Sequence, residues 1–140
     1  MFRLISFKPP VFVELGYDRL SITDIETGWK QIYMAKERFS TKRLTLAHFD
    51  NASQLLTNAL NSFWKSNPNP RRGPLRLGII WMNNGDDREL TSTERLGLRD
   101  LMEISGFMQT SIYSNPSQPE PVELKEVIEM MGHDFTKYAR

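Results

Sequence analysis

The feature that most constrains the fold is an apolar segment followed by a capped helical segment. Residues 75–82 read Leu-Arg-Leu-Gly-Ile-Ile-Trp-Met, which predicts a central strand covered on both faces. After a polar loop, Thr91 and Glu94 predict a capping box at the start of a helix that Gly106 ends. A further strand-like run covers residues 108–113. Strand, helix and strand in this order predict a crossover unit with a helix packed on a sheet.

The segments around this unit complete the predicted fold. A meander of three short strands joined by tight turns comes first, and apolar residues spaced near 3.6 then predict a helix with Asp50 as its N-cap. Gly97 costs the capped helix roughly 1 kcal/mol relative to alanine, which predicts close packing there. The other elements are expected at residues 11–15, 20–25, within 29–39, 50–63 and 122–131.

This order, β-β-β-α-β-α-β-α, predicts an α/β fold with a mixed sheet of about five strands. We expect a single domain over residues 11–131. Residues 1–10 are expected to form a tail or short amphipathic segment, and residues 132–140 a second tail.

Composition excludes several classes of protein. The net charge is +1, from 18 basic and 17 acidic residues, which is too balanced to indicate a nucleic-acid binder. No cysteine is present, so disulfides, thiolate metal sites and thiol nucleophiles are excluded. We find no membrane span and no secretory signal. We therefore expect a cytoplasmic protein, with peripheral contact at the inner membrane face as an option.

A known protein family has matching residues at the positions of Thr91, Glu94, Arg95, Arg99 and Gly106. The chain resembles the first subdomain of the bacterial actin-like, shape-determining proteins of the MreB family, best over residues 45–116. A small enterobacterial stress-response protein is similar as well. The resemblance implies an actin-like, or RNase H-like, half with helices packed on its sheet.

The family's first phosphate loop has a counterpart here that departs from the pattern. Glu14 stands where the family has an aspartate that works with the metal ion, and Gly16 is followed by Tyr17 instead of small hydroxyl residues. The acidic pair that helps hydrolysis in the family is Ser114 and Asn115 here. A phosphate cradle needs backbone N–H groups and small side chains at close range. The loop is therefore interpreted as vestigial, and we predict no cofactor and no ATPase activity.

The resemblance implies a non-catalytic protein-interaction module with a role in cell shape or stress response. The expected partner is a protein, such as a filament-forming actin-like protein, and the expected contact surface is Arg95, Arg99 and Glu103. The alternative is a nucleotide- or small-ligand-binding protein whose cleft near Gly16 is completed by dimerisation. A third, weaker hypothesis is a toxin or antitoxin that acts on the cytoskeleton.

The N-terminal segment is a candidate for membrane contact. Its apolar side chains group on one side of a helical wheel, as in an interfacial helix, and members of the actin-like family often carry such a helix. A tail or an extra edge strand is the alternative. The candidate residues are Phe2, Arg3, Leu4, Ile5 and Phe7.

For the other candidate sites, a structural role suits the residues better than a functional one. Glu14 and Asp18 suit a strand end and a turn better than a remnant metal site, and the two histidines lack ligand spacing. A loop with two aspartates lacks the carboxylate spacing of a calcium loop. A basic patch beside two aromatic residues suits core packing better than nucleic-acid binding. These groups are His48 and His133; Asp86 and Asp87; and Lys65, Arg71, Arg72 and Arg76 with Phe63 and Trp64.

Overall fold

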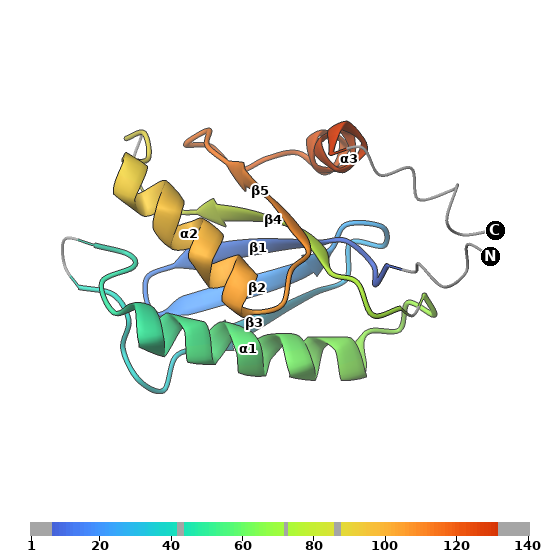
Figure 1. The fold of residues 1–140 in the computed structure, drawn as a ribbon, viewed down its shortest axis with the longest axis horizontal. Helices are drawn as coiled ribbons and strands as arrows, with labels where there is room; N and C mark the ends of the chain where they lie inside the picture. Colours follow the sequence, from blue (N-terminus) through green and yellow to red (C-terminus); the bar gives the residue numbers. More distant parts are fainter. Residues whose placement is uncertain (1–6, 42–43, 72, 86–87, 132–140) are drawn as a thin grey trace.

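The protein is a mixed five-stranded sheet with three helices in a computed structural model, which describes residues 7–41, 44–71, 73–85 and 88–131 (Figure 1). The strands lie in the order β3-β2-β1-β4-β5. β2 runs antiparallel to β1 and β3, whereas β4 runs parallel to β1 and β5. The predicted α/β fold with a mixed sheet is confirmed. The elements are β1 (Val11–Gly16), β2 (Arg19–Asp24), β3 (Lys30–Met34), α1 (Phe49–Ser66), β4 (Leu77–Met82), α2 (Ser92–Ile104), β5 (Gln109–Tyr113) and α3 (Pro121–Met130).

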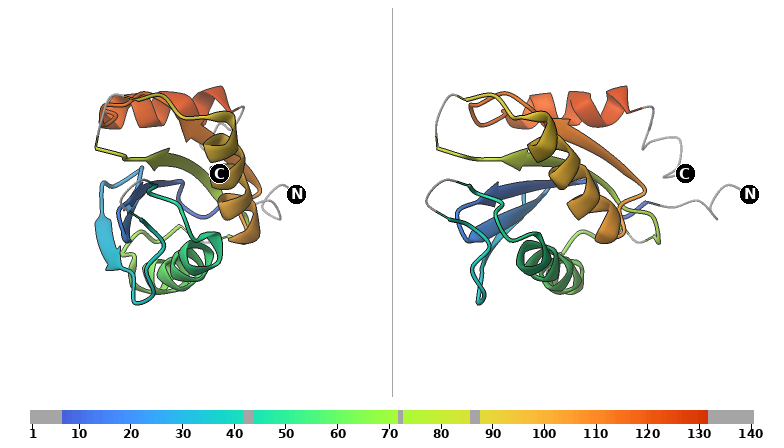
Figure 2. Two further views of the ribbon diagram at one scale, coloured as in Figure 1. Left: turned by 90° about the vertical axis from the view of Figure 1, so that its left-hand side faces the viewer. Right: turned by 60° about the vertical axis from the view of Figure 1, so that its left-hand side comes forward.

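Two apolar clusters lie on the two faces of the sheet. Helices α1 and α2 cover one face, and α3 lies over β4 on the other (Figure 2). Phe63 and Leu101 belong to the first cluster, and Trp81 and Leu124 belong to the second. Every residue of β4 is buried, because its alternate side chains enter one cluster and then the other. The prediction of a central strand covered on both faces is therefore confirmed.

The starts of α1 and α2 differ in how well the sequence predicts them. The capping box of α2 is present, since Glu94 N donates to Thr91 Oγ1 at 3.1 Å and Thr91 N donates to Glu94 Oε1 at 2.9 Å. For α1 the prediction is wrong: His48 occupies the N-cap position and Asp50 lies in the first turn. His48 N donates to Phe39 O at 2.9 Å, so a tertiary contact sets where this helix begins.

Close packing at a glycine occurs at Gly78 instead of Gly97. A Cβ added at Gly78 would lie 2.6 Å from Phe107 Cε1 and 2.8 Å from Met102 Cε. A Cβ at Gly97 would meet Leu46 Cδ2 at 3.5 Å, an ordinary contact distance. The β4 strand thus comes close to α2 and the segment that follows it only because residue 78 has no side chain.

The folded domain begins earlier than predicted. Phe7 is only 2% exposed and belongs to the α3-side cluster, while Lys8 N donates to Leu75 O at 2.8 Å. Pro9 and Pro10 are buried as well. The prediction that Phe7 contacts a membrane is therefore corrected, because its ring is enclosed by protein.

The rest of the predicted membrane segment, Phe2, Arg3, Leu4 and Ile5, lies outside the described residues, as does the tail at 132–140. Within the described ranges, no helix combines the length and the apolar character needed to cross a bilayer.

Candidate functional site

The predicted vestigial phosphate loop is the tight turn between β1 and β2. Gly16 pairs with Arg19 in the antiparallel ladder, and Tyr17 and Asp18 form the turn. Asp18 has a φ of 53°, in the left-handed region that aspartate tolerates better than most side chains. A hairpin of this kind keeps the backbone of Gly16 in the sheet instead of opening it as a cradle.

The carboxylate of Asp18 is held by the segment that leads into α1. Its Oδ1 accepts from Phe39 N and Ser40 N, both at 2.8 Å, and its Oδ2 accepts from Arg38 Nε at 2.9 Å. Asp18 N donates to Ser40 Oγ at 2.9 Å. Burial raises the pKa of Asp18, but these hydrogen bonds and the guanidinium charge outweigh it and lower the pKa below its usual value. The polar groups of this turn are therefore engaged within the protein.

Glu14 has a separate partner. Its Oε2 accepts from Asn83 Nδ2 at 3.1 Å, in the loop that follows β4. Glu14 and Asp18 thus serve two different contacts, and no cluster of three potential metal-ligating side chains occurs among the described residues. This arrangement favours the structural interpretation of both carboxylates.

The hollow beside Gly16 is small. Its volume is about 20 Å³, enough for roughly one water molecule. A larger cavity of about 250 Å³ opens between α3 and the β2–β3 turn, which is below the roughly 300–1,000 Å³ typical of ligand pockets. The hollow beside Gly16 is lined by Glu14, Gly16, Arg19, Leu20, Ser21, Lys30 and Ile32.

A buried carboxylate that the sequence analysis missed lies at the other end of β2. Asp24 is fully buried, and its Oδ2 accepts from Asn67 Nδ2 at 3.0 Å and Asn69 Nδ2 at 2.9 Å. Its Oδ1 accepts from Glu26 N and Thr27 N at 2.8 and 3.2 Å. The available signal was an aspartate just before a Glu-Thr-Gly turn, which is typical of side-chain-capped turns. Asp24 joins the β2–β3 turn to the segment after α1.

The described basic residues of the predicted patch have different surroundings, and Arg71 is not the solvated side chain that the structural interpretation expected. Arg71 pairs with Glu26 at 2.8 Å, and Arg76 Nη1 donates to Ser105 O. Burial lowers the pKa of Arg76. Phe63 is fully buried, and Lys8 Nζ lies 5.4 Å from the centre of the Trp64 ring. Lys65 is exposed in the last turn of α1, and Arg72 lies outside the described residues.

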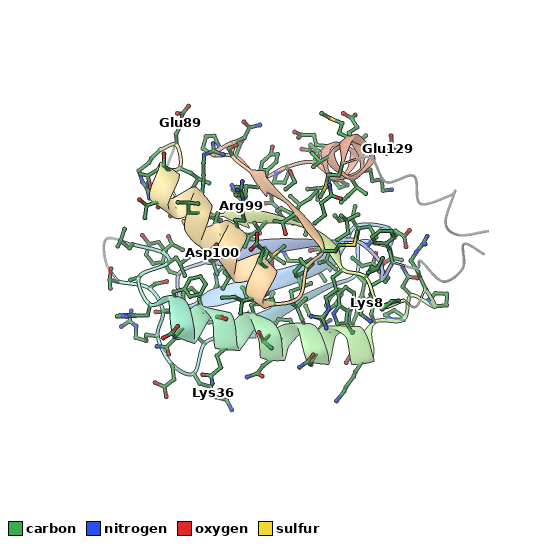
Figure 3. The ribbon with its side chains drawn as sticks, viewed as in Figure 1. Lys8, Lys36, Glu89, Arg99, Asp100 and Glu129 are labelled. Atoms are coloured by element: carbon green, nitrogen blue, oxygen red, sulfur yellow. The ribbon has the colours of Figure 1, made fainter. Side chains whose placement is uncertain are left out.

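The predicted partner surface on α2 is exposed. Arg95, Arg99 and Glu103 are all solvent-accessible, and within the described part of the chain none of them forms an ion pair. Leu96 is 58% exposed on the same side. Toward the C-terminus its neighbours at helical spacings of three, four and seven are Arg99, Asp100 and Glu103, so charged side chains flank it on that side. Figure 3 labels Arg99 and Asp100 on this helix.

The remaining candidates add no site. His48 is exposed at the start of α1, while His133, Asp86 and Asp87 lie outside the described residues.

In comparisons with known proteins, no family model matches the chain, and no curated protein or solved structure matches it significantly.

Proposed function

We propose that the protein is a non-catalytic protein-interaction module related to bacterial actin-like cytoskeletal proteins. The observation that carries the proposal is the exposed face of α2, where Leu96 is flanked on its C-terminal side by Arg99, Asp100 and Glu103. An exposed apolar side chain next to charges that form no ion pair among the described residues suits a small docking site, since apolar contact provides affinity and charge selects the partner.

The β1–β2 turn supports the non-catalytic part of the proposal. Its aspartate and backbone groups bind the protein's own Phe39 and Ser40 segment, at the position where the resembled family has a phosphate loop. The hollow beside Gly16 has room for about one water molecule, far less than a nucleotide needs. A role in cell shape or stress response, in the cytoplasm, is what the resemblance implies.

Filament co-sedimentation tests the partner. We expect the purified protein to pellet with filaments of an actin-like protein from the same host. The double variant Arg95→Glu/Arg99→Glu should reduce the pelleted fraction about tenfold, because it reverses two charges that face the partner. Lys125→Glu, an exposed charge reversal on α3, is the matched control and should pellet like the wild type. Equal pelleting of all three proteins would contradict the proposal that the exposed face of α2 contacts the partner.

A nucleotide assay tests the non-catalytic assignment separately. We expect no steady phosphate release from ATP and no rise in melting temperature with nucleotides, because a ligand that binds the native state tightly must stabilise it. Phosphate release that is lost in Glu14→Ala would contradict the proposal.

A further inference from the structure

The outer edge of β3 has exposed apolar side chains. Among the described residues, β3 pairs with no strand other than β2 and lies at one end of the sheet. Ile32 is 57% exposed and Met34 is 65% exposed, and both lie on the face of the sheet opposite α1. Helix α3 lies over β4 on that face, so it leaves these two side chains uncovered. Exposed apolar edge strands are sites of strand pairing between chains unless charges or other devices block them.

The register shows which backbone groups point outward. Asp24 N donates to Trp29 O at 2.8 Å and Ala35 N donates to Asp18 O at 2.9 Å, so Trp29 and Ala35 direct their backbone groups toward β2. Because direction alternates along an antiparallel ladder, the N–H and C=O groups of residues 30, 32 and 34 point away from the sheet. The outward C=O of Lys30 accepts from its neighbour's side chain, Gln31 Nε2, at 2.9 Å, an exposed contact that another strand can replace.

We infer that β3 of one molecule pairs antiparallel with β3 of a second copy, with Ile32 opposite Ile32 on the two-fold axis. In this register Lys30 lies opposite Met34 of the second copy, and each facing pair can exchange two N–H···O bonds. The sheet then continues across both molecules. The two Ile32 side chains and the two Met34 side chains form one apolar strip on the face that α3 leaves open.

Charge selects this register over its neighbours. A shift of two residues in one direction brings Lys30 opposite Lys36, and like charges directly opposite each other destabilise strand pairing. A two-residue shift in the other direction places Met34 opposite Gly28, which offers no side chain to contact. In the proposed register Arg19 lies two strand spacings, about 10 Å, from Lys30 of the second copy. That separation exceeds the Debye length of about 8 Å at physiological ionic strength.

This inference does not depend on the proposed function, because it concerns β3 and not α2. Sedimentation velocity on the full chain, from a few micromolar to several hundred micromolar, is the first test. We expect a concentration-dependent dimer, and at least a tenfold weaker one for Ile32→Glu and for Ile32→Lys, since each places like charges on the axis. An equimolar mixture of the two variants should dimerise again, because residue 32 then faces an opposite charge.

Val122→Glu, which removes a similarly exposed apolar side chain from α3, is the matched control and should dimerise like the wild type. A wild type that remains monomeric at the highest concentration overturns the inference. So does an Ile32→Glu variant that dimerises normally, or a mixture that stays monomeric.

A cross-linking test does not depend on the stability of the charged variants. The chain has no cysteine, so Ile32→Cys introduces one thiol per molecule. Facing residues of a hydrogen-bonded antiparallel pair have Cα atoms about 5.5 Å apart, within the range that a disulfide spans. We expect mild oxidation to convert Ile32→Cys to a covalent dimer at least ten times faster than Val122→Cys, which places the thiol at a similarly exposed position on α3. Equal rates would overturn the proposed contact.

Discussion

Gly78 is the position where the structure makes its sharpest prediction about stability. An added methyl group would lie 2.6 Å from Phe107 Cε1 and 2.8 Å from Met102 Cε, both shorter than real Cβ contacts. Met102 can move its terminal carbon, but the Phe107 ring is buried, so a shift of the ring would displace its neighbours. Overpacking of this kind costs about 1–3 kcal/mol. Replacing a strand glycine recovers roughly 0.5–1 kcal/mol of backbone entropy. We therefore expect Gly78→Ala to lower the free energy of unfolding by about 1–2 kcal/mol.

Gly97→Ala is the matched control and should have the opposite sign. The new Cβ has room, with its nearest neighbour Leu46 Cδ2 at 3.5 Å, and alanine is favoured over glycine in a helix by about 1 kcal/mol. For a domain of this size each kcal/mol shifts the melting temperature by about 3–5 °C. The two variants should therefore differ by about 10 °C.

Urea denaturation and thermal melting followed by circular dichroism measure both variants. We also expect Gly78→Ala to destabilise the protein less in a Met102→Ala background, because one of the two clashing groups is then absent. A Gly78→Ala protein as stable as the wild type would refute the close approach of β4 to Phe107. A Gly97→Ala protein less stable than the wild type would refute the claim that a Cβ fits at residue 97 without a clash.

Three further predictions concern polar contacts, and urea denaturation measures each. Asp24→Ala leaves two asparagine amides and two backbone N–H groups without their acceptor, so we expect the free energy of unfolding to fall by about 3 kcal/mol or more. Asp100→Ala removes an exposed aspartate and should leave the free energy of unfolding nearly unchanged. Thr91→Ala removes the side-chain cap of α2 and should lower the free energy of unfolding by about 1 kcal/mol. An unchanged free energy of unfolding would contradict the capping box. Asp18→Asn should cost about 1 kcal/mol at pH 7. Because the folded-state pKa of Asp18 lies below the ordinary aspartate value of 3.8, this stabilisation is present above pH 3.8 and is lost as the pH falls through the folded-state pKa. A difference in the free energy of unfolding between variant and wild type that does not narrow below pH 3.8 would contradict the assignment.

Local patterns in the sequence were sufficient to predict the order of elements. The capping box at Thr91 and Glu94 is confirmed because both partners lie within one helical turn. The fully buried β4 is confirmed because a strand covered on both faces must be apolar at nearly every position. The exposed side of α2, which carries the candidate partner surface, could also be predicted, because helical periodicity alone separates the exposed side of a helix from its buried side.

Contacts between distant segments could not be predicted in this way. Phe7 belongs to the core because it lies beside Leu75, and α1 begins before Asp50 because Phe39 O accepts from Ala47 N and His48 N, just before the helix. The partners of Asp24 lie more than forty positions away, at Asn67 and Asn69. No local propensity contains this information, because a carboxylate in a turn has the same sequence pattern whether or not it is buried.

The sequence by itself therefore determined which segments form strands and helices and which sides of them are apolar. Only the tertiary structure decided that the strands lie in the order β3-β2-β1-β4-β5, that Gly78 and not Gly97 is the tightly packed glycine, and that β3 is left at an uncovered edge. The physical reason is that periodicity is set by the geometry of one element, whereas order, close approach and coverage depend on which elements meet.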